Sequence, residues 1–106
     1  DATCAVLKAA GLREQVMIDV SHANSSKQHQ RQITVADDVA QQIAAGDIRI
    51  TGLMIESHLQ EGRQDIVAGQ PLTPGVSVTD ACISLAQTVP LLESLAAAVR
   101  TRRALR

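Results

Sequence analysis

The sequence contains no phenylalanine, tryptophan or tyrosine among its 106 residues. Aromatic side chains bury about 150–250 Å² each, so a core must be built here from small aliphatic side chains, which stabilise a fold only when they pack over a large surface. Only two cysteines are present, Cys4 and Cys82, which excludes a disulfide framework and favours the reducing cytoplasm. The shortage of large core residues, together with a first residue that is Asp and not Met, indicates a piece of a larger protein.

Long hydrophobic runs and an excess of charge of one sign are also missing. The longest unbroken apolar run is the five residues 95–99, far short of the roughly 20 that a membrane-spanning helix needs, and no segment has the pattern of a secretion signal. Ten basic and 11 acidic side chains give a net charge of −1, which offers no electrostatic footprint for nucleic acid or an anionic membrane. We therefore expect neither partner.

The apolar residues that are present predict an alternation of helices and strands. The pattern gives a helix over residues 2–10, a buried strand over 16–20, a helix over 27–45 that Asn24, Ser25 or Ser26 could cap, and a second buried strand over 48–55. A strand, a helix and a strand in this order make a βαβ unit with parallel strands, and hence an α/β fold. Two parallel strands need further strands and cover on both faces. We therefore expect residues 1–106 to be part of a single larger α/β domain, with no domain boundary inside them.

The second half of the chain is less regular. Residues 57–79 have no clear period and contain three glycines and two prolines, which is typical of a functional or disordered connection. Thr88 or a neighbour should begin a final helix with Pro90 in its first turn. Its expected apolar stripe is Leu92, Leu95, Ala96 and Val99. The arginines at positions 100, 102, 103 and 106 then place favourable positive charge at a helix C-terminus, a simpler account than a role in nucleic-acid binding.

Polar side chains follow both predicted strands, at the point where each strand ends. His22 follows the first strand and Glu56 ends the second. Parallel strands bring such residues to one edge of the sheet, where α/β folds bind their ligands, and imidazole and carboxylate suit a divalent first-row metal. Asp80, at the end of the long connection, could fold back as a third ligand. For His22 alone, a capping or hydrogen-bonded loop histidine is the simpler interpretation.

Three further residues leave alternatives open. Asp19 lies inside an apolar strand, where an unpaired carboxylate is costly, so it has either a structural partner or a role in orienting a metal ligand. His58 fits a supporting histidine or a loop anchor better than a ligand. Lys27, at the predicted start of a helix, could bind phosphate or be an ordinary solvated lysine.

Three blocks of the sequence resemble the class I 3-deoxy-D-arabino-heptulosonate 7-phosphate (DAHP) synthases. They are residues 17–27 (MIDVSHANSSK), residues 55–59 (IESHL) followed by Glu61 and Gly62, and residues 75–82 (GVSVTDAC), with a final helix that ends in Arg102 and Arg103. The resemblance covers nearly the whole chain but only the last third of a family member. It implies a (β/α)₈ TIM barrel of which this chain is the C-terminal segment, with about the seventh and eighth strands and their helices.

The resemblance also implies an enzyme activity and a metal. The family condenses phosphoenolpyruvate with erythrose 4-phosphate to give DAHP and phosphate, the first step of the shikimate pathway to the aromatic amino acids. His22, Glu56 and Asp80 match its metal ligands, with His22 and Asp80 also catalytic, and the ion would be Mn²⁺, or Fe²⁺, Co²⁺ or Zn²⁺. The fourth ligand is a cysteine outside this sequence, and neither Cys4 nor Cys82 has a matching context. Family members are usually dimers or tetramers.

The same resemblance limits what this chain can do alone. The upstream lysine and arginine residues that hold both phosphates in the family are absent, so the isolated segment should be inactive. Two alternatives remain: a related 3-deoxy-manno-octulosonate 8-phosphate synthase, and a non-catalytic fragment with an incomplete metal site. Cys82, two residues from Asp80, is expected to be the oxidation-sensitive thiol, unless it is simply a small buried core residue.

Overall fold

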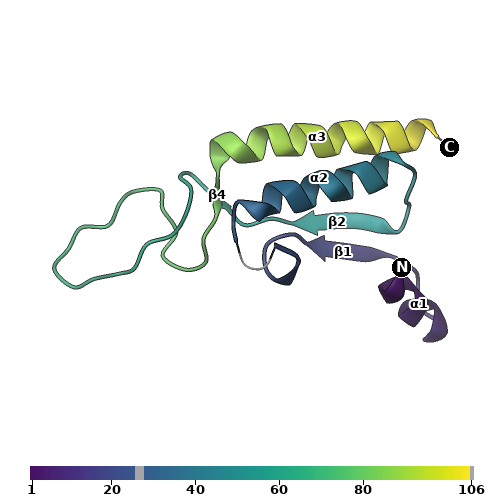
Figure 1. Ribbon diagram of the computed structural model, residues 1–106, viewed down its shortest axis with the longest axis horizontal. Helices are drawn as coiled ribbons and strands as arrows, with labels where there is room; N and C mark the ends of the chain where they lie inside the picture. Colours follow the sequence, from purple (N-terminus) through teal and green to yellow (C-terminus); the bar gives the residue numbers. More distant parts are fainter. Residues whose placement is uncertain (26–27, 106) are drawn as a thin grey trace.

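The structure, a computed structural model, describes residues 1–25 and 28–105. Its elements are, in order, α1 (Ala2–Ala9), β1 (Val16–Asp19), the short 3₁₀ helix η1 (Ala23–Ser25), α2 (Arg31–Ala44), β2 (Ile50–Met54), β3 (Ser57–His58), β4 (Ile83–Ser84) and α3 (Leu85–Ala104). They form a flat body of 56 × 31 × 16 Å, with a long loop extending from one end (Figure 1). The predicted alternation of helices and strands is confirmed.

β1 and β2 form a two-stranded parallel sheet, as the sequence predicts. The register pairs Val16 with Ile50 at one end and Asp19 with Met54 at the other. Parallel pairing requires a crossover connection, which α2 supplies. Because both strands run in the same direction, the residues after Asp19 and after Met54 emerge at one edge of the sheet (Figure 1).

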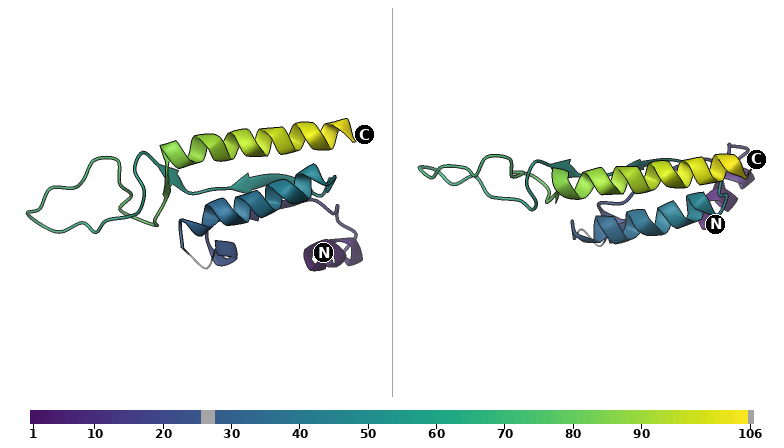
Figure 2. Two further views of the ribbon diagram at one scale, coloured as in Figure 1. Left: turned by 45° about the horizontal axis from the view of Figure 1, so that its top comes forward. Right: turned by 90° about the horizontal axis from the view of Figure 1, so that it is seen from above.

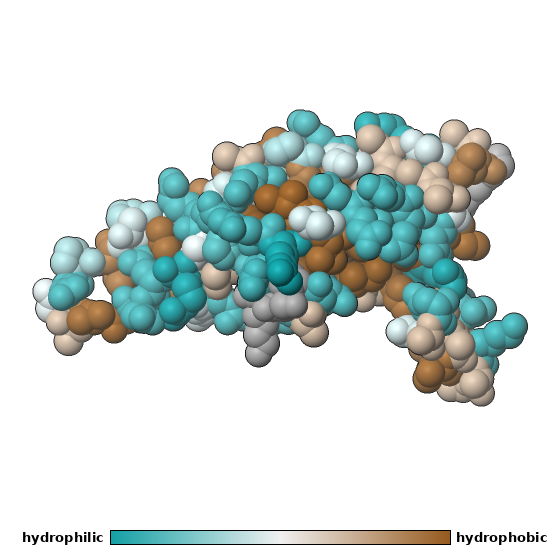
Figure 3. All heavy atoms as spheres, in the orientation of Figure 1, coloured by the Kyte–Doolittle hydropathy of each residue, from teal (hydrophilic) through white to brown (hydrophobic). Residues whose placement is uncertain are grey.

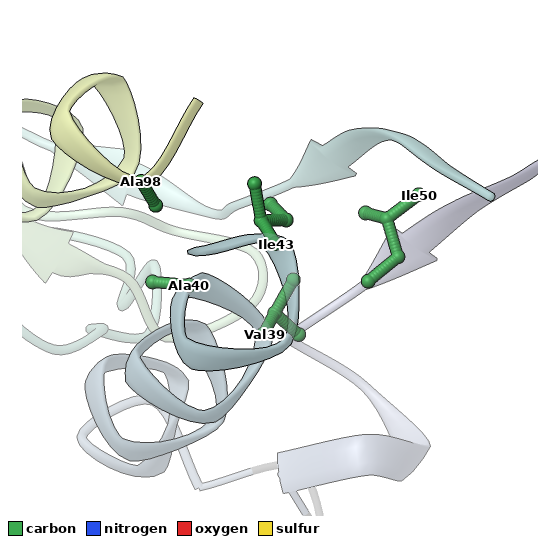
Figure 4. Close-up of a cluster of buried hydrophobic side chains, with 5 residues drawn as sticks. All are labelled: Val39, Ala40, Ile43, Ile50 and Ala98. Atoms are coloured by element: carbon green, nitrogen blue, oxygen red, sulfur yellow. The ribbon is translucent and has the colours of Figure 1, made fainter. Parts of the chain in front are cut away.

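The main core lies between the two long helices and β2. Val39, Ala40 and Ile43 of α2 pack with Ile50 of β2 and Ala98 of α3, and each of the five is at most 7% exposed (Figure 4). Helix spacing depends on the side chains at the contact, and the alanines leave room for α2 and α3 to lie side by side (Figure 2). The core is therefore closed without aromatic rings.

The start of α2 differs from the prediction. The helix begins at Arg31, with Gln30 as an N-cap residue that makes no side-chain capping bond, and not at residue 27. Asn24 does not cap it, because Asn24 lies within η1 and its side-chain amide donates to the backbone carbonyl of Asp19 at 2.7 Å. Ser26 and Lys27 lie outside the described residues, so the proposed roles of both stay predictions.

The last helix begins earlier than predicted. Ser84 is the N-cap of α3 and forms a capping box with Gln87, a reciprocal pair that satisfies two orphan backbone donors. Pro90 consequently lies inside the helix and not in its first turn. The Ser-x-x-Gln pattern of the capping box, and not the proline, marks the start of this helix.

The buried face of α3 also differs from the predicted stripe. Leu91 and Ala98 are buried, whereas Leu92 is 53% exposed and Ala96 is exposed. Leu95 and Val99 do pack against the core. Aliphatic residues occur on several sides of this helix, so periodicity alone could not separate the face that packs from its neighbour.

The long connection after β2 is partly ordered by pairing, although no regular structure was predicted there. Its first residues form β3, which pairs in parallel with β4 through Ser57–Ile83 and His58–Ser84. Beyond this pairing the loop projects away from the helices and the sheet (Figures 1 and 2). The returning arm therefore comes back beside the end of β2 before α3 begins.

Apolar side chains lie exposed on several surfaces, and brown patches are visible in Figure 3. Met17 of β1 is 66% exposed, and Val89 of α3 is 47% exposed. Within the described residues, the β1–β2 sheet has no third strand. These features are typical of a sheet that continues into further strands. No helix in the described ranges is both long and apolar enough to cross a membrane.

One of the C-terminal arginines joins the end of α3 to the connection between α2 and β2. Arg102 Nη1 donates to the backbone carbonyls of Asp47 at 2.8 Å and Ile50 at 2.9 Å. The contact ties the last turn of α3 to the start of β2. Arg102 therefore does more than place charge at a helix end.

We expect Arg102→Ala to lower the free energy of unfolding by about 1.5–3 kcal/mol, because hydrogen bonds to a charged group contribute that much. Urea denaturation of the protein measures it. Arg103→Ala is the matched control, since Arg103 is exposed on the same turn, and it should change stability by less than about 0.5 kcal/mol. Equal effects of the two variants on stability would contradict a stabilising role for the Arg102 hydrogen bonds.

The turn before β2 predicts a specific loss of stability in acid. Hydrogen bonds from the Arg49 guanidinium to both carboxylate oxygens lower the pKa of Asp47 to about 2 from its ordinary value of 3.8. A depressed pKa stabilises the fold above the unfolded pKa, and this contribution disappears as the pH falls through the folded value.

Asp47→Asn should therefore be less stable than the wild type at about pH 5, and the difference should shrink between about pH 4 and pH 2. Urea unfolding across this range measures it. Asp37→Asn, the same charge change at an exposed position of α2, should show a smaller pH-dependent difference. A difference for Asp47→Asn that is constant with pH would refute the assignment.

Candidate metal centre

Three side chains predicted as ligands meet at the edge where β1 and β2 end. His22 follows β1, Glu56 follows β2, and Asp80 lies on the returning arm of the long loop. His22 Nε2 is 3.0 Å from Glu56 Oε1 and 3.2 Å from Asp80 Oδ2. The predicted convergence of these side chains is therefore present in the structure.

Asp19 orients His22. Its carboxylate is 2.7 Å from His22 Nδ1 and also accepts the backbone N–H groups of Ser21 at 2.8 Å and His22 at 3.2 Å. With Nδ1 as the donor to a carboxylate, the ring directs Nε2 toward Glu56 and Asp80. Of the two roles left open for Asp19, the geometry favours orienting His22.

Glu56 is held by two residues that the sequence analysis missed. The side-chain carbonyl of Gln32 accepts the Glu56 backbone N–H at 2.8 Å, and the Gln32 amide donates to the Glu56 carbonyl at 3.1 Å. The Ser21 hydroxyl donates to the Glu56 carboxylate. Gln32 is fully buried and lies four residues before buried Ala36, so its place on the apolar face of the helix was the available signal.

The electrostatics of this cluster favour positive charge at its centre. The hydrogen bond with Asp19, and after it the one with Asp80, raises the pKa of His22 above its ordinary value. The contact with His22 likewise lowers the pKa of Asp19. Three carboxylates thus surround one imidazole, an environment that stabilises a bound cation.

The cluster opens into a small cavity. The cavity has a volume of about 240 Å³ and is lined by Ser21, His22, Glu56, Arg63, Asp80 and Ala81. Glu56 is 20% exposed and Asp80 is 67% exposed, so one carboxylate is set in the wall and the other lies at the mouth. The arrangement leaves room for a small molecule beside the three side chains.

The chemistry of the donor set fits a divalent cation. One imidazole nitrogen and two carboxylate oxygens lie within 4.8 Å of one another. Ligand atoms bound to one ion at about 2.0–2.2 Å lie at most about 4.4 Å apart, so only a small adjustment is needed. Imidazole with carboxylate suits first-row divalent metals.

The other candidate residues lie elsewhere. His58 is exposed, and its Nδ1 accepts the backbone N–H of Leu59 at 2.8 Å, which fits a loop anchor. Among the described residues, the group that could hold a metal ion contains neither Cys4 nor Cys82. Cys82 is buried, which raises the pKa of its thiol. This burial favours the simpler interpretation of Cys82 as a small core residue.

Fold and site together define an α/β protein with a candidate metal centre at the carboxyl ends of parallel strands. Residues 2–93 match the sequence model of the DAHP synthetase I family. The chain belongs to this family.

Individual proteins similar to this chain carry names that agree with the family assignment. The chain is 57% identical, over 92% of its length and 28% of the relative's, to the Phe-sensitive phospho-2-dehydro-3-deoxyheptonate aldolase of Escherichia coli. It is 50% identical, over 97% of its length, to the phospho-2-dehydro-3-deoxyheptonate aldolase of Haemophilus influenzae. The solved structure of the Francisella tularensis phospho-2-dehydro-3-deoxyheptonate aldolase superposes on 96% of the chain with a TM-score of 0.89 and 49% identity. The chain spans under a third of the length of each relative, 28% and 29% in the first and last of these.

The contact between Asp19 and His22 predicts the effect of Asp19→Asn. An asparagine amide can donate to Nδ1, so it would favour the opposite tautomer, with the proton on Nε2. Nitrogen NMR of the neutral His22 ring, recorded above its pKa, should then show Nε2–H, whereas donation to Asp19 predicts Nδ1–H in the wild type. Asp37→Asn supplies the same charge change away from the site and should leave the tautomer unchanged. If Asp19→Asn kept the Nδ1–H form, the orienting role would be wrong.

Proposed function

We propose that this chain supplies three metal ligands of a DAHP synthase, namely His22, Glu56 and Asp80. The observation that carries the proposal is their convergence at the end of two paired parallel strands, in a chain that belongs to the DAHP synthetase I family. The ion would be Mn²⁺, or Fe²⁺, Co²⁺ or Zn²⁺, all of which accept imidazole and carboxylate ligands.

In this proposal β1 and β2 are about the seventh and eighth strands of a (β/α)₈ barrel. The parallel pairing, the crossover through α2 and the position of the cluster at the carboxyl ends of the strands support it, since barrel enzymes build their active sites there. The exposed apolar residues of β1 and α3 would be covered by the rest of the barrel. Residues 1–106 would then be one part of a single domain.

The proposed reaction is the condensation of phosphoenolpyruvate with erythrose 4-phosphate, giving DAHP and phosphate, at the entry to aromatic amino-acid synthesis. The names of the relatives support this choice over the related octulosonate synthases. A bound divalent ion would act as a Lewis acid toward the aldehyde oxygen. The other residues that bind the two phosphates would come from parts of the enzyme outside this sequence, so the segment alone would be inactive.

The residues of this chain have distinct roles in the proposal. Asp19 keeps the His22 ring turned so that Nε2 faces the site, and Gln32 fixes the backbone of Glu56. Asp80, at the mouth of the cavity, is the carboxylate best placed to lie beside an incoming aldehyde. Ser21 fixes the direction of the Glu56 carboxylate.

The test is metal binding by the complete enzyme that carries this segment. We expect His22→Ala, Glu56→Ala and Asp80→Ala each to weaken Mn²⁺ binding by at least about 100-fold. Substitution of residues that only support a metal ligand already lowers metal affinity by about 10–100-fold. Electron paramagnetic resonance of free Mn²⁺ measures it, with DAHP formation assayed in parallel. His58→Ala is the matched control, since His58 lies two residues from Glu56 but outside the cluster.

Two results would contradict the proposal. Wild-type Mn²⁺ affinity in the Glu56→Ala or His22→Ala variant would refute the ligand assignment. Full activity after exhaustive chelation would refute the metal-dependent reaction.

A further inference from the structure

The Asp80 carboxylate has less side-chain support than the other two proposed ligands. Asp80 is 67% exposed, and its carboxylate contacts His22, which is itself a member of the cluster. His22 and Glu56, by contrast, are held by Asp19, Ser21 and Gln32. The position of the Asp80 carboxylate therefore depends on the backbone of its bend.

Both ends of this bend are attached to the outgoing arm of the long loop. Before the bend, Gln64 N–H donates to the Ser77 carbonyl at 2.8 Å. After it, Gly62 and Cys82 exchange two backbone hydrogen bonds of 2.9 and 3.1 Å. Residues 78–81 thus cross a short gap whose two sides are fixed.

Arg63 holds the middle of the bend. It lies between the two attachment points, and its Nε donates to the carbonyl of Thr79 at 2.9 Å. Thr79 directly precedes Asp80 in the chain. The guanidinium also donates from Nη2 to the exposed carboxylate of Asp65 at 2.7 Å.

Arg63 also lines the cavity that contains the three proposed ligands. A guanidinium stays charged at every accessible pH, and its planar fork can serve two acceptors at once. The same side chain therefore joins the outgoing arm, the Asp80 bend and the wall of the site.

We propose that Arg63 is a positioning residue that holds Asp80 in place for metal binding through the Thr79 carbonyl. The inference rests on the proposed function. Without the guanidinium, the bend keeps its two ends, the Ser77 hydroxyl at the Thr79 N–H and the Cys82 thiol at the Asp80 carbonyl. It loses the charged donor to the Thr79 carbonyl. The carboxylate then samples more orientations, and binding an ion must restrict them again.

The experiment compares Arg63→Ala, Arg63→Lys and Asp65→Asn in the complete enzyme that carries this segment. Mn²⁺ affinity is measured by electron paramagnetic resonance titration, and kcat is measured at saturating Mn²⁺. We expect Arg63→Ala to weaken Mn²⁺ binding by about 10-fold or more, as loss of residues that support a metal ligand does. Its kcat at saturating Mn²⁺ should fall by a smaller factor than the Mn²⁺ affinity, because the ion once bound fixes Asp80.

The other two variants separate positioning from general stability. Arg63→Lys keeps one donor that can reach the Thr79 carbonyl and should recover part of the affinity. Asp65→Asn removes the exposed ion pair of Arg63 without touching Thr79, so it should bind Mn²⁺ as the wild type does. If Arg63→Ala does not fold, the other two variants still test the proposal. A positioning role requires Arg63→Lys to bind Mn²⁺ more weakly than the wild type and Asp65→Asn to bind it as the wild type does.

Glu56→Ala, included in the same titration, distinguishes failure of the Arg63 role from failure of the proposed metal site. Weak Mn²⁺ binding in Glu56→Ala together with wild-type affinity in Arg63→Ala would overturn the role of Arg63 and leave the metal site standing. Wild-type affinity in Glu56→Ala would overturn the metal site itself. An equal loss of affinity in Asp65→Asn and Arg63→Ala would also overturn positioning through Thr79.

Discussion

The hydrogen bonds between the buried amide of Gln32 and the backbone of Glu56 are the contact on which the site depends. Both polar ends of this amide are satisfied by one residue, and a buried polar group left unpaired costs about 1–3 kcal/mol. The end of β2 is therefore tied to α2 in one position. From there the Glu56 carboxylate meets the Ser21 hydroxyl and the His22 ring, which come from the other strand.

The site thus combines two residues held next to paired strands with one residue held on a loop. His22 and Glu56 follow paired strands and are supported by residues of β1 and α2, whereas Asp80 lies on a loop that projects beyond the sheet (Figure 1). Sites built on regular elements are held more accurately than sites on loops. Bridges between the two arms of the loop compensate for this difference, and they give the third carboxylate a defined place.

The sequence predicted the parts of the fold that depend on long-range periodicity and on the ends of strands. The βαβ unit and the meeting of His22 with Glu56 follow from two apolar runs and the rule that parallel strands end at one edge. The starts of α2 and α3 differ from the prediction. Gln30 makes no side-chain capping bond that would mark the start of α2, and α3 begins at the capping box of Ser84, upstream of the proline. Gln32 and Arg63 could not be assigned, since a polar residue on a helix or loop reveals its partner only when distant segments have met. Metal binding itself stays a proposal.

The order of contacts along the chain has a consequence for how the site assembles. Asp19 and His22 are three residues apart, whereas His22 and Asp80 are 58 residues apart. Closing a longer loop costs more chain entropy, so a contact between distant residues requires more of the chain to be ordered. The histidine and its orienting aspartate therefore need only a short segment to be ordered, whereas the third carboxylate also needs the long loop to have returned to β4. Completion of the cluster thereby reports that this whole stretch of the chain has reached its native topology.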